Sequence, residues 1–337
     1  MNLASISSPA PPWFEDLEVG RFFGSAPAVT LTEGHAALHQ ALAGDRLRLA
    51  LDRMLADAVL GPGPPAAHPA LVWDTAIGQS TVATGRVVAN LFYRGLLLHR
   101  TPRLGDTLRT VTEVVARREN RVREGRRATG LVVLRIRTVD QEERPVLDFS
   151  RCAMLPLRDA PAGVQGDIGE GAADLEPEPL HTAAAALDLD RYRAGVPGPH
   201  FADVPDGWEW EVEGGDVVDG APALARLTLN VAMAHLDAGS GDHGRRLVYG
   251  GHTIALAAAQ ATRALPALVT ILGWHAADNS APVFEGDTLR SRIEVERREA
   301  LPGGGGLVHL RSQATTSRAA GGDDEKVLDW RYVGVLA

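Results

Sequence analysis

The sequence predicts an α+β protein that contains two copies of one fold, each an antiparallel sheet around a central helix. The chain has 337 residues, which suits two domains of ordinary size. The string GDTLR occurs at 105–109 and again at 286–290, an offset of 181 residues. VLDF at 146–149 and VLDW at 327–330 repeat that offset. Matches in the same order at one offset indicate a duplication.

A third echo helps to set the limits of the two copies. FEDL at 14–17 resembles FADV at 201–204, at an offset of 187 residues. We therefore expect an N-terminal copy over 13–157 and a C-terminal copy over 200–337. The segment 158–199 between them is rich in Ala, Gly, Pro, Asp and Glu. That composition predicts a mobile or surface-draped linker that buries no core.

Each copy is expected to contain two helices followed by strands. The helices are predicted over 32–43 and 71–84 in the first copy, and over 223–236 and 250–265 in the second. The last of these is Ala-rich and apolar nearly all round, which is typical of a helix buried on most sides. Four strands follow it. The alternation of apolar and polar residues at 289–295 and 307–311 indicates a sheet with one solvated face. This order is that of an α+β protein.

Composition excludes several classes of partner. The net charge of −9 and the absence of a long basic run argue against nucleic acid. Cys152 alone cannot form an intramolecular disulfide or a zinc cluster, and no other cluster of metal ligands is evident. The segment 1–13 lacks a signal-peptide pattern, and no apolar run reaches the roughly 18 residues of a membrane span. We expect a cytoplasmic protein with no metal and no membrane partner.

Three segments of the second copy resemble a known enzyme family. They are NVAMAHLD at 230–237, GRRLVYGGH at 244–252 and NSAPVFEGD at 279–287. With the predicted order of elements, they resemble the MaoC-like hotdog proteins, in which a sheet wraps a central helix. Two copies in one chain resemble the double-hotdog members, most of all the mesaconyl-CoA hydratase (β-methylmalyl-CoA dehydratase) branch. The resemblance spans most of both copies but not the linker, and it implies a tandem hotdog fold.

The resemblance implies the catalytic residues of the second copy. The hydratase motif of this superfamily reads Asp-x-Asn-Pro-x-His-x-Asp, which places His235 and Asp237 on its last two polar positions. Asn230 stands where the catalytic Asp is expected, and Ala232 replaces the Asn. A neutral amide cannot act as a general base. His235 is therefore the candidate acid–base group, with Asn230 or Asp237 positioning the water.

The first copy has lost this motif. Asp45 matches its first position, but Ala50 stands where the histidine is expected. At most one site per chain is therefore predicted, and the first copy is expected to supply the acyl pocket or shape complementarity. Tyr93 and the following Arg94 are the candidates that line the acyl end of the site.

The start of the second central helix is the candidate site for the thioester. Tyr249, Gly250 and Gly251 precede or open that helix, where backbone N–H groups are free and the helix dipole is positive. The Gly251 amide is the predicted donor to the thioester oxygen. Arg245 and Arg246, just before this helix, are candidates for the phosphates of CoA.

With these residues, the resemblance implies an (R)-type enoyl-CoA hydratase or β-hydroxyacyl-CoA dehydratase that needs no cofactor other than the CoA of its substrate, with a mesaconyl-CoA-like short branched substrate. Two alternatives stay open, an acyl-CoA thioesterase and a non-catalytic acyl-CoA-binding protein. So do plainer roles, such as helix-end hydrogen bonding for Asn230 and a solvated face for the two arginines. A homodimer is also left open.

Overall fold

A computed structural model describes residues 10–169, 171, 174–240, 244–318 and 324–337, so most of the segment searched for a signal peptide lies outside it. The long strands of the first half are β3 (Ala89–Leu98), β4 (Thr107–Glu119), β5 (Thr129–Val139) and β6 (Pro145–Pro156). Those of the second are β9 (Leu268–Asn279), β10 (Thr288–Ala300), β11 (Gly306–Ser317) and β12 (Glu325–Leu336). Short edge strands are β1 (Phe22–Phe23), β2 (Val29–Thr30), β7 (Glu209–Glu211) and β8 (Asp216–Val217).

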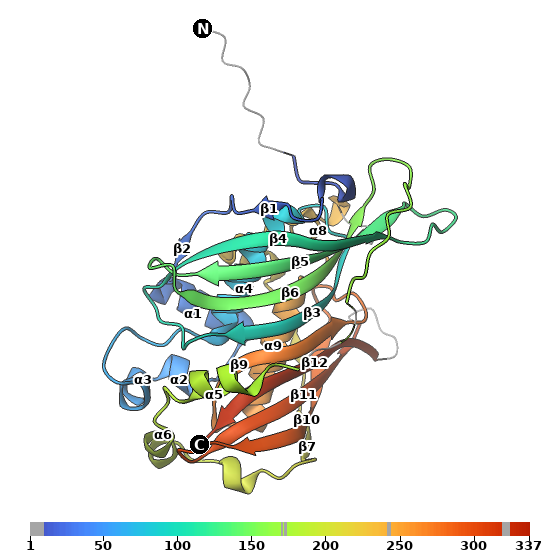
Figure 1. Ribbon diagram of the computed structural model, residues 1–337. Coiled ribbons are helices and arrows are strands. Elements are labelled where there is room, and N and C mark those ends of the chain that lie inside the picture. Colours follow the sequence, from blue (N-terminus) through green and yellow to red (C-terminus); the bar gives the residue numbers. More distant parts are fainter. Residues whose placement is uncertain (1–9, 170, 172–173, 241–243, 319–323) are drawn as a thin grey trace.

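The strands that the structure describes form one 12-stranded antiparallel sheet that runs through both halves (Figure 1). Its order is β1-β4-β5-β6-β3-β9-β12-β11-β10-β7, with β2 paired to β4 and β8 to β10. The second half of this order mirrors the first. The halves meet where β3 pairs with β9, from Phe92 opposite Asp278 to Leu97 opposite Gly273. The double hotdog predicted from the sequence is confirmed, while the copy limits 13–157 and 200–337 stay a prediction.

The two halves also repeat a contact between an aromatic ring and a glycine. Phe14 begins the short 3-10 helix η1 (Phe14–Asp16), and Phe201 begins η3 (Phe201–Asp203). A Cβ atom at Gly130 would lie 2.3 Å from the Phe14 ring, and one at Gly306 would lie 2.1 Å from the Phe201 ring. Only glycine leaves room for these rings on the sheet. The echo between 14–17 and 201–204 therefore marks equivalent positions.

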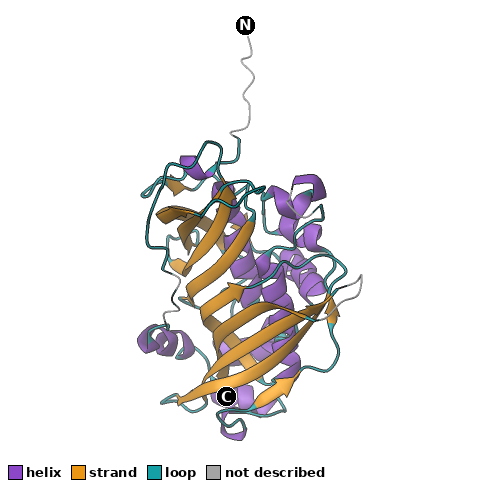
Figure 2. Ribbon diagram, turned by 90° about the vertical axis from the view of Figure 1, so that its right-hand side faces the viewer, coloured by secondary structure: helices purple, strands orange, loops and turns teal. Residues whose placement is uncertain are grey.

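The two central helices are α4 (Pro69–Ser80), continued by η2 (Thr81–Ala83), and α9 (Gly250–Ala264). They pack side by side on one face of the sheet (Figure 2). Every residue of α4 is buried, as its apolar sequence predicts. The predicted helix over 71–84 thus begins two residues earlier and ends in a 3-10 turn. No helix in the described ranges is long and apolar enough to cross a membrane.

The first predicted helix of each copy has a different outcome. The helix over 32–43 is present as α1 (Glu33–Ala43), with the Thr32 side chain capping its start. The prediction of one helix over 223–236 is wrong, because the chain forms α7 (Ala221–Leu227) and α8 (Met233–Leu236) with a break between them. Leu229 has a φ of 56° within this break, a conformation that no helix contains. The break places Asn230 outside both helices.

The segment 158–199 is not a linker without a core. It forms α5 (Pro177–Ala184) and α6 (Leu189–Gly195), which lie across the sheet face opposite the central helices (Figure 1). Leu180 and Tyr192 are buried there, and the Tyr192 hydroxyl donates to the Leu268 carbonyl at 3.0 Å. The helices α2 (Arg48–Leu51) and α3 (Arg53–Leu60) contribute to the same apolar cluster. The prediction from composition was wrong here because this face of β9, β11 and β12 is itself apolar, and burying it against the segment is favourable.

Candidate active site

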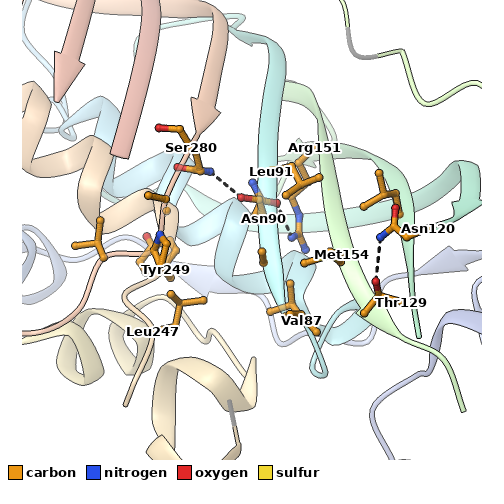
Figure 3. A pocket seen from close by; sticks show the side chains of 18 of the residues that line it. Val87, Asn90, Leu91, Asn120, Thr129, Arg151, Met154, Leu247, Tyr249 and Ser280 are labelled. Carbon is orange, nitrogen blue, oxygen red and sulfur yellow. Dashed lines mark hydrogen bonds between the residues drawn. The ribbon is translucent and has the colours of Figure 1, made fainter. Parts of the chain in front are cut away.

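A cavity of about 1230 Å³ lies between the two halves and receives residues from both (Figure 3). The first half contributes β3, β5, β6 and the hairpin between β4 and β5, while the second contributes the break before α8, α8 itself, the start of α9 and the segment after β9. Five predicted site residues line this cavity: Asn230, His235, Tyr249, Gly250 and Tyr93. Four others do not: Asp237, Gly251, Arg245 and Arg246.

His235 is held with one ring nitrogen engaged. It lies on α8, and its Nδ1 is 2.8 Å from the Leu247 carbonyl oxygen. A carbonyl only accepts, so the neutral ring has its proton on Nδ1 and Nε2 is the basic atom. Burial, helped by the positive charge of Arg151, lowers the pKa of His235 to about 4. The imidazole is therefore neutral near pH 7 and able to accept a proton.

Asn230 presents an amide donor to the cavity. The residue is 3% exposed, and its Oδ1 accepts from the Ala232 N–H at 3.0 Å. Its backbone N–H donates to the Ala225 carbonyl, which fixes the turn after α7. The Nδ2 atom is buried and has no partner among the described residues. A buried donor of this kind favours a ligand or water oxygen at the site.

The start of α9 has the open geometry expected of a thioester site. Tyr249 is the residue before the helix, and burial together with the charge of Asp74 raises its pKa, so the phenol stays protonated. A Cβ atom at Gly250 would lie 3.3 Å from the Tyr93 hydroxyl and 3.2 Å from Asn279 Nδ2. The Gly250 N–H belongs to the first helical turn, where intrahelical acceptors are absent. Polar groups of both halves therefore converge on Gly250.

Gly251 is a glycine for a different reason from the predicted one. A Cβ atom there would lie 2.2 Å from the Tyr249 ring and 2.5 Å from Asp74 Oδ1. The residue thus packs against buried side chains rather than leaving space for a thioester. Its amide still belongs to the open first turn of α9, so its role as an oxyanion donor stays a prediction.

Asp237 and the two predicted arginines have partners outside the cavity. Asp237 is exposed and accepts from the Gly239 N–H and the Ser240 hydroxyl, so it shapes the turn after α8. Arg245 lies over the Phe284 ring, with 4.4 Å between the guanidinium carbon and the ring centroid. Arg246 donates from Nη2 to a Glu285 carboxylate oxygen at 2.6 Å. Closeness in sequence to α9 did not indicate which way these side chains extend.

The sequence contained a stronger basic signal that the motif comparison missed. The hairpin between β4 and β5 presents four exposed arginines that line the cavity: Arg121, Arg123, Arg126 and Arg127. They occur within the short string RVREGRR, between the end of β4 and the start of β5. Arg127 also stacks on Trp13, with its guanidinium carbon 4.6 Å from the ring centroid. This cluster, which we call the arginine hairpin, gives the cavity a cationic rim.

Solved structures match the whole fold. The double-hotdog protein Rv0216 of Mycobacterium tuberculosis is 50% identical, covers 97% of this chain and 99% of that chain, and has a TM-score of 0.89. A MaoC domain protein of Chloroflexus aurantiacus, described as a dehydratase, is 27% identical, covers 98% and 99% of the two chains, and has a TM-score of 0.83.

Two curated proteins also match over most of their length. Mesaconyl-CoA hydratase of Cereibacter sphaeroides is 32% identical over 310 residues, 89% of this chain and 88% of that protein. The chain belongs to the MaoC-like double-hotdog hydratases and dehydratases. β-Methylmalyl-CoA dehydratase of Chloroflexus aurantiacus is 29% identical over 321 residues, 91% and 88% of the two chains. The resemblance stated from the sequence is confirmed, and no family model matches the chain.

In this MaoC-like chain, large aromatic residues of the second copy occupy the positions that the duplication relates to first-copy residues of the cavity wall. The offset of 181 residues relates Tyr93 to Trp274 and Arg151 to Tyr332. Trp274 packs against Trp73 with 4.9 Å between ring centroids, and Tyr332 stacks on Trp330 at 3.7 Å. All four are fully buried. This filling supports the prediction of one site per chain.

Asp45, which matches the first position of the motif in the first copy, already has hydrogen-bond partners within the protein. Its carboxylate accepts from the Leu47 N–H at 2.7 Å and lies 3.1 Å from His68 Nε2. Burial opposes ionisation of Asp45, but the charge of His68 and these hydrogen bonds outweigh it and hold the pKa of Asp45 below the usual range. Ala50 lies within α2 and brings no polar group to it. Asp45 is thus a structural carboxylate.

Proposed function

We propose that this protein is an (R)-type enoyl-CoA hydratase, or β-hydroxyacyl-CoA dehydratase in the reverse direction. The hydratase and dehydratase names of its curated relatives confirm the class predicted from the sequence, and those names make a mesaconyl-CoA-like substrate the specific proposal. The observation that supports it most is the neutral His235 in a cavity shared with the first turn of α9. We further propose a cytoplasmic enzyme that needs no cofactor, and a homodimer as its assembly.

The reaction adds water across the double bond next to the thioester. Asn230 holds the water, and His235 Nε2 removes a proton as the water oxygen bonds to the β-carbon. The π electrons move toward the thioester oxygen, where the N–H groups of Gly250 and Gly251 stabilise the enolate. His235 then returns its proton to the α-carbon. One histidine thus moves the proton that the family motif assigns to a His–Asp pair.

A panel of acyl-CoA substrates tests this function. Crotonyl-CoA, longer enoyl-CoAs and mesaconyl-CoA are incubated with the full chain, and loss of the enoyl-thioester absorbance is followed. We expect hydration of at least one of them. Release of free CoA thiol instead would indicate the thioesterase alternative. Tight binding without turnover across the panel would indicate the non-catalytic alternative.

The arginine hairpin is expected to bind the phosphates of CoA. Replacing Arg123 and Arg126 together by Glu should raise the KM for crotonyl-CoA by about 10- to 100-fold with little change in kcat, because these contacts are made equally in ground and transition states. The effect should weaken as salt is raised. Steady-state kinetics at two salt concentrations measure it.

Two controls accompany this double variant. Crotonyl-pantetheine lacks the nucleotide phosphates, so its KM should be the same for the variant and the parent protein. Arg245→Ala tests the site predicted from sequence, and we expect little change because Arg245 packs over Phe284 outside the cavity. A loss with crotonyl-pantetheine equal to that with crotonyl-CoA would contradict the assignment.

The pH dependence should report the low pKa of His235. Because burial lowers this pKa to about 4, the free enzyme keeps a neutral base well below pH 6.5. We expect the acid limb of kcat/KM to fall below about pH 5 rather than near the ordinary histidine value of about 6.5. Tyr249 and Arg151 are the other titratable groups near the ring.

The same shift affects stability. An unfolded chain binds this proton with an ordinary pKa, so the folded state loses stability as pH falls from about 6.5 toward 4. The melting temperature is therefore measured at each pH, and rates are compared only where the fold holds. An acid limb centred near pH 6.5 in folded enzyme would refute the assignment of His235 as a buried neutral base.

A further inference from the structure

Arg151 is a buried cation in the wall of the cavity (Figure 3). It lies on β6 in the first half and is 3% exposed. Its Nη2 donates to the Thr84 hydroxyl at 2.7 Å and to the Ser80 carbonyl at 3.4 Å, and its Nη1 donates to Asn90 Oδ1 at 3.3 Å. Each of these acceptors is neutral. The Nε atom is buried and has no partner among the described residues.

No ion pair joins Arg151 to a carboxylate in the part of the chain that the structure describes. Arginines elsewhere have such partners, as Arg311 has with Asp329 at 2.7 Å and Arg331 with Glu296 at 2.8 Å. A guanidinium stays charged in proteins, and a buried charge without a counter-ion is strongly unfavourable. Three neutral acceptors hold the side chain in place but leave its charge uncompensated. An anion within the cavity would compensate it.

The position of Arg151 in the cavity determines which anionic group of a ligand can contact it. The arginine hairpin lies at the rim of the cavity and is the site proposed for the CoA phosphates. Arg151 lies instead among the groups proposed for the chemistry, opposite Tyr93 in the pairing of β3 with β6. Its charge is also felt at His235, whose pKa it helps to lower. The part of an acyl-CoA that meets Arg151 is therefore the acyl group near the reacting carbons.

We propose that Arg151 binds a free carboxylate on the acyl group and so selects monothioesters of dicarboxylic acids. In an enoyl thioester of this type the carboxylate is attached to the β-carbon, next to the atom that the water attacks. Thr84 and Asn90 are positioning residues that hold the guanidinium for this contact. This inference deepens the proposed function and rests on it for the substrate, but its binding step is independent of turnover.

Two saturated thioesters test the contact without any reaction. Methylsuccinyl-CoA has the free carboxylate, and 2-methylbutyryl-CoA has a methyl group in its place. Calorimetry should show that the parent protein binds methylsuccinyl-CoA about 100-fold more tightly, and that Arg151→Gln removes this preference by weakening methylsuccinyl-CoA alone. Arg151→Lys should retain part of it. Equal binding of the two ligands by the parent protein would overturn the proposal without any variant.

Further variants separate this role from a structural one. Arg311→Gln, a paired arginine outside the cavity, should bind both ligands as the parent does. Thr84→Val removes only the hydroxyl that holds Nη2, so it should weaken methylsuccinyl-CoA alone and by less than Arg151→Gln. Circular dichroism and melting temperature check each fold. Equal weakening of both ligands in folded Arg151→Gln would contradict the assignment.

Kinetics distinguish failure of this inference from failure of the proposed function. Tiglyl-CoA has the skeleton of mesaconyl-CoA with a methyl group in place of the carboxylate. We expect Arg151→Gln to lower kcat/KM for mesaconyl-CoA by about 100-fold and to leave tiglyl-CoA within a few-fold. Equal losses of kcat/KM on both substrates would contradict the carboxylate contact but not the hydratase activity. A preference for methylsuccinyl-CoA that depends on Arg151, without hydration of any enoyl-CoA, would support the carboxylate contact and contradict the proposed hydratase activity.

Discussion

His235→Ala should abolish hydration of enoyl-CoA, with a loss in kcat of at least about 1000-fold, and leave the fold intact. The size follows from the proposed mechanism, in which the histidine both removes the proton from water and returns it to carbon. The described residues that line the cavity include no Asp, Glu or second His that could replace it. The ring lies on the cavity wall, where it donates to the Leu247 carbonyl and has its centroid 5.9 Å from that of the Tyr249 ring, so stability should change little. Initial rates with the best substrate of the panel measure the effect.

Matched variants make this expectation specific. His99→Ala removes a half-exposed histidine that pairs with Asp148 away from the cavity, and it should keep full activity. Asn230→Ala removes the buried amide donor and should lower kcat by about 10- to 100-fold, less than the loss of His235. Asn230→Asp restores the family carboxylate and should retain turnover. Full activity of folded His235→Ala would reject the proposed mechanism.

Gly78→Ala should destabilise the protein by about 4 kcal/mol, near the upper end for a single substitution. A Cβ atom on Gly78 would lie 1.8 Å from the Thr228 carbonyl oxygen and 2.7 Å from its carbonyl carbon. The obstacle is backbone, which cannot turn aside as a flexible side chain does. Thr228 lies in the break between α7 and α8, two residues before Asn230, so the site should also be disturbed. Guanidinium titration followed by circular dichroism measures the stability.

Gly34→Ala is the matched control for this variant. Gly34 lies within α1, and its Cβ atom would meet only Thr32 Oγ1, at an ordinary 3.6 Å. Alanine should therefore be neutral or stabilise the helix by up to about 1 kcal/mol. Equal stability of Gly78→Ala and Gly34→Ala would show that α4 can move away from the break at little cost, and would contradict the predicted clash with Thr228.

The sequence predicts most of the fold because the duplication preserves local signals. Gly105 and Gly286, in the repeated GDTLR strings, both have positive φ, at 99° and 88°, at the turn before β4 and β10. The break after α7 has no such signal. Leu229 adopts a positive φ that its type disfavours, so contacts with the rest of the chain impose it. A prediction based on helical periodicity alone therefore continues the helix through Leu229.

The site was predictable where a motif fixes the spacing and not where the fold brings distant segments together. His235, Asn230 and Gly250 follow from the motif and the start of a helix, and all three line the cavity. Arg151 comes from a strand of the other half, and its proposed role rests on its having no carboxylate partner among the described residues, which only burial and neighbours reveal. The arginine hairpin lies at the tip of a turn, a position that also suits a plain solvated surface.

The aromatic residues of the second copy that stand opposite the cavity residues in the repeat have a consequence for how this enzyme can change. In a dimer of identical subunits, every substitution appears in both active sites at once. Here Arg151 and Tyr332 occupy repeat-related positions, yet one faces the ligand cavity and the other stacks on Trp330. Joining the copies in one chain uncoupled the two positions. A substitution in the half proposed to select the acyl group therefore leaves unchanged the half that carries the proposed proton-transfer histidine.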